Sequence, residues 1–224
     1  MSDFDGKLAA LRATLVAQGD RVLELVLRAV ECYFDLDRQQ AAQVIAADDL
    51  IDRVDVEIER ASIPLLAMGI VDEHRIRSVL TIVKVNNELE RIADLGVAIA
   101  EVVEAYPDLS ERTPPTFRVM ANSVVGMLRD AVRALGAGNA GLAQEVLSFD
   151  DTVSRFKEEI TLHAQEQVAA GAFSVKFAFR LMAVTKSLER IADHCTNVAE
   201  QVIYLETGKI VRHLPEGWSD PTVI

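Results

Sequence analysis

The sequence has few of the residues on which strands, disulfide frameworks and sharp turns depend. Only 5% of its 224 residues are aromatic, and it contains 11 glycines, 6 prolines and 2 cysteines. Ala, Leu, Val, Glu and Arg dominate instead, which is the composition of packed amphipathic helices, so we expect no strands. Because half of the residues are hydrophobic, the chain can bury a substantial core.

Signals for disulfides, targeting and membrane insertion are also lacking. Cys32 and Cys195 stand far apart without CxxC spacing, which favours two reduced, buried thiols in a cytoplasmic protein. No stretch of about 18 apolar residues occurs without a charge, so we expect a soluble protein with no direct membrane insertion. The acidic start of the chain, residues 1–5, argues against a targeting presequence.

Basic residues are outnumbered by acidic ones. Lys and Arg total 23 against 35 Asp and Glu, which gives a net charge of −12 and an isoelectric point of about 4.8. This field repels nucleic-acid phosphates and anionic lipids, so the composition argues against nucleic acid as a partner. We expect recruitment to a membrane to run through protein partners.

Helical periodicity runs almost from end to end, and polar caps, glycines and prolines divide it into six helices. Asp37 can cap the second helix, and Thr113 is an expected N-cap followed by Pro114 at the first helical position. Ser174 precedes the sixth helix and Gly208 ends it. The predicted helices cover residues 4–35, 38–69, 72–105, 114–136, 139–171 and 175–208.

An internal repeat sets the domain organisation. The hexapeptide Leu-Glu-Arg-Ile-Ala-Asp of residues 89–94 returns at residues 188–193, a spacing of 99, and the aspartate pair 48–49 matches the pair 150–151 at a spacing of 102. We therefore predict an all-α fold, a tandem repeat of two three-helix bundles with six long antiparallel helices. The predicted units are a first bundle over residues 1–106, a linker over 107–115, a second bundle over 116–208 and an irregular tail over 209–224.

Carboxylates recur along one face of the third and of the sixth helix. In each helix two acids four residues apart are followed by a third acid seven residues later. Like charges at this spacing destabilise a helix by about 0.2–0.5 kcal/mol, so the arrangement calls for an arginine, a lysine or a metal ion. Acids of the second and fifth helices lie at similar distances from the hairpin turns and are expected to face these stripes. The candidate ligands are Asp48, Asp52, Glu90, Asp94, Glu101, Asp150, Glu189, Asp193, Asn197 and Glu200.

Two interpretations of these acids remain open. Oxygen ligands suit Mg²⁺, Mn²⁺ and iron, whereas a structural zinc site would usually add Cys or His. Alternatively, the stripes are solvated faces held by ion pairs between helices to Arg53, Arg91 or Arg190. The repetition of identical acids in both halves favours the metal site over a chance acidic surface.

No arrangement typical of a catalytic site is found. The four histidines form no HxxxH pair and no Glu-x-x-His motif, which argues against the ligand set of ferritin-like di-iron enzymes. There is no Gly-rich phosphate loop and no GxSxG elbow. We therefore expect a protein without enzymatic activity.

The repeated hexapeptide carries a resemblance to a known family. Both copies, and especially residues 189–200 around the second, resemble the duplicated signature of the PhoU family, and the similarity covers nearly the whole chain. The resemblance implies a six-helix protein that in some members binds multinuclear metal clusters, here of Fe, Mn, Mg or Zn. It also implies signalling of phosphate sufficiency between the phosphate ABC transporter and a membrane sensor histidine kinase, which represses the phosphate-starvation response.

The match departs from the family pattern at three positions. Ala98 stands where the family often has asparagine, Ser154 where an aspartate is common, and Arg75 where an acid precedes the third helix. The leading hypothesis is a non-enzymatic, metal-binding adaptor that contacts the transporter ATPase and the kinase and forms a homo-oligomer, a homodimer. The alternatives are a carboxylate-bridged metal-dependent enzyme and a metal-free helical scaffold.

Overall fold

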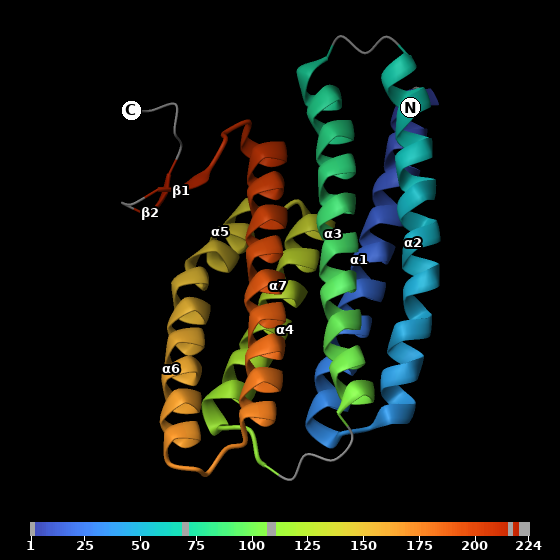
Figure 1. Ribbon diagram of the computed structural model, residues 1–224. Helices are drawn as coiled ribbons and strands as arrows, with labels where there is room; N and C mark the ends of the chain where they lie inside the picture. Colours follow the sequence, from blue (N-terminus) through green and yellow to red (C-terminus); the bar gives the residue numbers. More distant parts are fainter. Residues whose placement is uncertain (1–2, 69–71, 107–110, 215–216, 220–224) are drawn as a thin grey trace.

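The computed structural model describes residues 3–68, 72–106, 111–214 and 217–219, and within these ranges the chain forms seven helices and one short hairpin (Figure 1). The elements are α1 (Asp3–Asp35), α2 (Arg38–Ala67), α3 (Glu73–Ala105), α4 (Pro115–Ala137), α5 (Ala140–Ser148), α6 (Asp150–Ala169), α7 (Val175–Thr207), β1 (Arg212–Leu214) and β2 (Gly217–Ser219). The all-α fold is confirmed. The second helix's predicted end at Gly69 and part of the predicted linker lie outside the described residues.

Six helix ends follow local capping chemistry. Four N-cap side chains each accept a hydrogen bond from a backbone N–H of the first turn, which satisfies a donor that the helix cannot use; these are Asp37, Asp72, Asn139 and Ser174. Gly138 and Gly208 end α4 and α7 in the left-handed conformation, at φ +61° and +74°. At these two positions a glycine avoids the steric penalty of a Cβ atom.

The start of α4 differs by one residue from the prediction. Pro114 is the N-cap and Pro115 is the first helical residue, and no side chain caps this end. A residue that precedes proline is driven to extended backbone, and Pro114 accordingly has ψ 149°. The predicted cap at Thr113 is therefore wrong, because Pro115 prevents Pro114 from being helical.

The expected fifth helix is interrupted once. Phe149 separates α5 from α6, and its N–H donates to the carbonyl of Val146, three residues earlier, at 3.2 Å. This tighter bond breaks the regular ladder without a glycine or proline. Asp150 and Asp151 then open α6, where carboxylates interact favourably with the helix dipole.

The two halves share one hydrophobic core. Helices α1–α3 form the first half and α4–α7 the second, and α3 packs against α7 while α1 packs against α4 (Figure 1). The buried side chains form one continuous cluster from Phe4 to Ile203. A Cβ atom at Gly96 of α3 would lie 2.5 Å from Leu25 of α1, so glycine permits the close approach of these helices.

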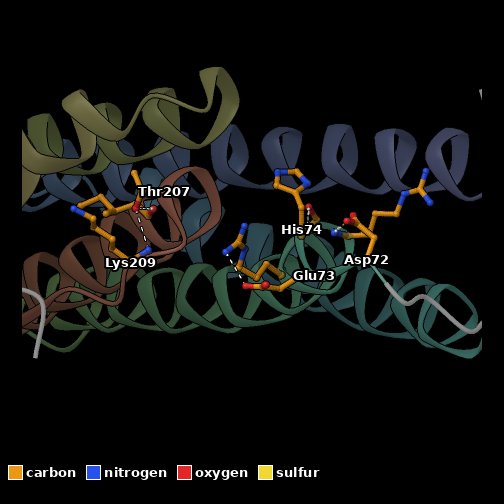
Figure 2. Close-up of polar contacts among 9 residues, drawn as sticks. Asp72, Glu73, His74, Thr207 and Lys209 are labelled. Atoms are coloured by element: carbon orange, nitrogen blue, oxygen red, sulfur yellow. Dashed lines mark hydrogen bonds and ion pairs between the residues drawn. The ribbon is translucent and has the colours of Figure 1, made fainter. Parts of the chain in front are cut away.

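The start of α3 also meets the end of α7 (Figure 2). Arg77 forms an ion pair with Glu73 at 3.1 Å and lies 5.8 Å from the centre of the Tyr204 ring. Its guanidinium also lies against Gly208. This contact ties together two helix ends that are far apart in the sequence.

Strands were not expected, and the structure differs in the tail. There β1 pairs with β2 in antiparallel fashion, with Arg212 opposite Ser219. These strands of three residues each lie outside the core (Figure 1). Both cysteines are free and buried, as predicted. None of the helices described is long and apolar enough to cross a membrane.

Candidate functional site

Acidic side chains of α2 and α3 gather on one side of the first half. We call this group the first-half cluster; it comprises Asp48, Asp52, Asp55, Glu90 and Asp94. Asp48 feels the negative charges of Asp52 and Asp94, and Glu90 feels those of Asp94, Asp55 and Asp52. The structure therefore brings acids of the second and third helices together at similar distances from the hairpin turn, as the sequence indicated.

Asp48 is the most perturbed acid of the first-half cluster. Burial, together with the charges of Asp52 and Asp94, raises the pKa of Asp48 to about 6. Its Oδ1 atom is buried and has no hydrogen-bond partner in the part of the chain that the structure describes. A buried carboxylate oxygen without a partner is costly, so this atom favours either a proton or a cation.

Little positive charge from the protein reaches the first-half cluster. Arg91 contacts Glu90 at 3.4 Å and Asp94 at 3.8 Å, and its own side chain is 53% exposed. Exposed ion pairs of this kind contribute about 0–1 kcal/mol. Burial and the charge of Asp94 still leave the pKa of Glu90 raised. Arg53 does not compensate either, because it donates to the backbone carbonyl of Asp49.

The equivalent acids of the second half have partners. We call Asp150, Glu189 and Asp193 the second-half cluster. Lys157 of α6 lies 2.8 Å from one carboxylate oxygen of Glu189, and Lys186 of α7 lies 2.6 Å from the other. Burial alone would raise the pKa of Glu189, but the two ammonium groups outweigh it and lower that pKa.

Asp193 shows the limit of this compensation. Burial, followed by the charges of Glu189 and Asp150, keeps the pKa of Asp193 raised. No ion pair to Arg190 is found among the described residues. The sequence left an arginine, a lysine or a metal open as the compensating cation, and the ion-pair alternative named Arg190, whereas the structure uses Lys157 and Lys186.

The repeat itself shows at which positions the halves differ. At the spacing of 102 that relates α2 to α6, Lys157 takes the place of Asp55, and Ser154 that of Asp52. At the spacing of 99 that relates α3 to α7, Lys186 takes the place of Asn87. These lysines were visible in the sequence but were not aligned with their counterparts, so their role was missed.

Three of the predicted ligands lie apart from both clusters. Glu101 is exposed on α3. Asn197 donates to Glu88 at 2.9 Å, and Glu200 pairs with Arg212. The structure therefore directs the last part of the acidic stripe of α7 toward the other half and toward β1.

Glu88 forms a polar link between the halves that the sequence analysis did not identify. Its carboxylate on α3 lies 2.7 Å from Nδ1 of His194 on α7 and also accepts from Asn197. Burial would raise the pKa of Glu88, but these hydrogen bonds outweigh it and lower that pKa. A cleft of about 650 Å³ beside this link is lined by charged residues of α2, α3 and α7 and by Arg212.

The fit of a metal differs between the halves. Nowhere in the described ranges do three or more His, Cys, Asp or Glu side chains stand ready to hold an ion. The first-half cluster nevertheless has carboxylate oxygens, which suit a hard cation, with an oxygen of Asp48 that has no partner among the described residues and raised pKa values for three carboxyls, Asp48, Asp55 and Glu90. In the second-half cluster both oxygens of Glu189 already have ammonium partners, so the residues do not fit an added cation there.

Fold and clusters together define a duplicated helical-bundle protein, with carboxylates at equivalent places in both halves. A family model, the PhoU domain, matches residues 15–103 and again residues 117–202. The chain belongs to the PhoU family.

Relatives and a solved structure agree over nearly the full length. The Clostridium acetobutylicum phosphate-specific transport system accessory protein PhoU homolog is 32% identical, over 93% of this chain and 96% of its own. PhoU homolog 1 of Thermotoga maritima is 28% identical, over 96% of this chain and 93% of its own. The crystal structure of PhoU from Pseudomonas aeruginosa superposes with a TM-score of 0.87 at 28% identity and covers 92% of this chain and 100% of its own.

Proposed function

We propose that this chain is a non-enzymatic negative regulator of phosphate uptake, which links a phosphate ABC transporter to a sensor histidine kinase. The observation that carries the proposal is the PhoU domain, which matches both halves and most of the chain. Relatives of nearly the same length are named accessory proteins of the phosphate-specific transport system. The transporter ATPase and the cytoplasmic part of the kinase are the partners that follow from this role.

The charge of the chain bears on how such a regulator reaches the membrane. A net charge of −12 opposes attraction to anionic lipids. We therefore propose that the chain lies in the cytoplasm and is recruited to the membrane by contacts with proteins. Complementary basic patches on those partners would speed association and lose effect at high salt.

The proposed role includes a cation at the first-half cluster. Asp48, Glu90 and Asp94 would supply carboxylate oxygens, which suit Mg²⁺, Mn²⁺ or iron. Such an ion would neutralise the acids of α2 and α3 and hold the two helices together. We propose no ion at the second-half cluster, because Lys157 and Lys186 already neutralise Glu189.

A deletion strain tests the regulatory role. Without this gene, a reporter of phosphate-starvation genes is expected to stay on in excess phosphate, and the wild-type gene is expected to switch it off again. In parallel, the purified protein is expected to retain the transporter ATPase and the cytoplasmic part of the kinase in pull-downs. Reporter output that stays low after deletion, together with no retention of either partner, would contradict the adaptor role and favour a metal-dependent enzyme.

The cation is tested separately. The protein is saturated with Mn²⁺, desalted and analysed for bound metal. Retention of the ion supports the cation at the first-half cluster. If the protein switches the reporter off and yet retains no ion, the metal-free scaffold is the better description.

A further inference from the structure

A second cavity lies at the opposite end of the bundle from the start of α3. It measures about 720 Å³ and opens between the end of α1, the segment 111–114 and the first turns of α4 and α7, at the lower end of Figure 1. Three arginines from different segments line it: Arg112 before α4, Arg118 on α4 and Arg180 on α7. We call it the arginine cavity.

Arg180 supplies a buried positive charge to the arginine cavity. The residue is only 3% exposed. One of its Nη atoms donates to the carbonyl of Tyr106 at 3.1 Å, and the guanidinium lies 5.0 Å from the centre of the Tyr33 ring. Its Nε has no hydrogen-bond partner among the described residues. Because burying a charged donor without an acceptor is costly, this group favours an anion beside it.

Arg118 and Arg112 stand at the mouth of the arginine cavity. The guanidinium carbon of Arg118 lies 3.8 Å from the centre of the Phe34 ring, and this stacking holds the group in place. Both residues are exposed. Within the described part of the chain, no carboxylate forms an ion pair with any of the three arginines, and the ion pairs that are found lie elsewhere.

The local charge is opposite to that of the whole protein. Glu111 is the single acid among the described residues that line the arginine cavity, and its Oε1 accepts from the backbone N–H of Ser174 at 3.2 Å. In the part of the cavity that the structure describes, three guanidinium groups and one carboxylate thus share a hollow in a chain of net charge −12. A concentration of positive charge on such a background attracts small anions from solution.

We propose that the arginine cavity binds phosphoryl oxyanions of a small soluble molecule. Guanidinium groups match the oxygens of phosphate bidentately, and three of them suit a ligand with two or more negative charges. The volume falls in the range of about 300–1,000 Å³ that is typical of small-molecule sites. Inorganic phosphate or a larger phosphorylated molecule meets this chemistry, and the binding test separates them.

Calorimetric titrations of the full chain in EDTA, at constant ionic strength, test this site. The probes are inorganic phosphate, pyrophosphate and ATP, with sodium chloride as the ionic control. Saturable binding of phosphate alone would identify the free ion as sufficient. Binding only of pyrophosphate or ATP would identify a larger phosphorylated molecule. Either result supports the site.

Matched variants on α4 locate the binding. Arg118→Glu is expected to weaken binding at least tenfold, whereas Arg129→Glu, an equal change of charge at another exposed position of α4, is expected to stay within about twofold. Circular dichroism verifies that both variants are folded. The proposal is overturned if no probe binds beyond the chloride control, or if the two variants weaken binding equally. The test requires no regulatory partner, so it can fail while the proposed function holds.

Discussion

The two halves of this protein share three acids at equivalent places but neutralise them differently. In the first half, Asp48 has a raised pKa and an oxygen without a hydrogen-bond partner among the residues that the structure describes. In the second half, Glu189 has an ammonium group at each of its oxygens. The fold repeats in both halves, while lysines at two positions of the repeat place fixed positive charges in the second half only. Among the described residues, two ammonium groups thus compensate the acids of the second half, whereas the exposed Arg91 is the partner in the first half.

The largest expected effect comes from giving the first half the lysines of the second. Asp55→Lys with Asn87→Lys should weaken Mn²⁺ binding at least a hundredfold, about 2.7 kcal/mol, because two ammonium groups would neutralise the acids and repel the ion. Binding is measured by calorimetry. The double variant Glu57→Lys with Gln39→Lys changes the net charge equally at exposed positions of the first half, and its affinity should be nearly unchanged. Equal losses in the two variants would refute local competition.

The reverse experiment removes the cations of the second half. Lys157→Ala with Lys186→Ala should lower the free energy of unfolding by about 2 kcal/mol at pH 7, since Glu189, whose side chain is 15% exposed, would lose both partners. Breaking a fully buried pair costs about 3–5 kcal/mol, and exposure of the lysines reduces that cost. Urea unfolding in EDTA measures the effect, with Arg190→Ala as the near-neutral control.

The same pair has a defined pH dependence. The lysines lower the pKa of Glu189 below its ordinary value of 4.5, so the stability that they add is present above pH 4.5 and is lost as the pH falls below that value. The lysine double variant should therefore differ most from the wild type at neutral pH and least at about pH 3. A constant difference across this range would contradict the ion-pair explanation.

A smaller effect is expected at the link between the halves. Glu88→Gln should cost about 1 kcal/mol, because it removes the charge from the hydrogen bonds to His194 and Asn197. Glu104→Gln, at an exposed position of the same helix, should change the unfolding free energy by less than about 0.5 kcal/mol. If the two variants are equally stable, the link contributes nothing to the association of the halves.

The smallest expected change has the opposite sign. Asp48→Asn should stabilise the metal-free protein by about 0.5 kcal/mol at pH 7, a figure reduced for the partial exposure of Asp48. The pKa of Asp48 is raised from 3.8 to about 6 in the folded state. As the pH falls from 7 toward 4, the folded wild type therefore binds a proton at a higher pH than the unfolded chain does, and its stability rises. The variant should lack this gain, and thermal unfolding across that range measures it. Destabilisation at pH 7 would contradict the raised pKa.

The fold was predictable where its determinants are local. A cap such as Asp37 or Gly208 depends on residues within one helical turn, so the sequence displays it directly. The break at Phe149 has no such marker, because it arises from one tightened backbone bond. The duplicated hexapeptide revealed the two halves because equivalent residues of a repeat occupy equivalent places in the fold.

The candidate site was predictable only in part. The distance of each acid from the hairpin turn correctly predicted that Asp48 and Asp94 lie close together, since antiparallel helices pair residues at equal distances from a turn. It could not show that Asn197 turns toward Glu88, because that contact depends on how α3 packs against α7. Nor could periodicity rank Lys157 above Arg190 as a partner for Glu189, because side-chain reach between helices decides that choice.

Metal content in two matched double variants tests the difference between the halves most directly. Glu90→Ala with Asp94→Ala removes acids of the first-half cluster, and Glu189→Ala with Asp193→Ala removes their equivalents at the spacing of 99. Each protein is saturated with Mn²⁺, desalted and analysed for bound metal, with circular dichroism to verify folding. We expect the second-half variant to retain the metal of the wild type and the first-half variant to lose it. Loss of metal from the second-half variant, with retention in the first-half variant, would contradict this expectation.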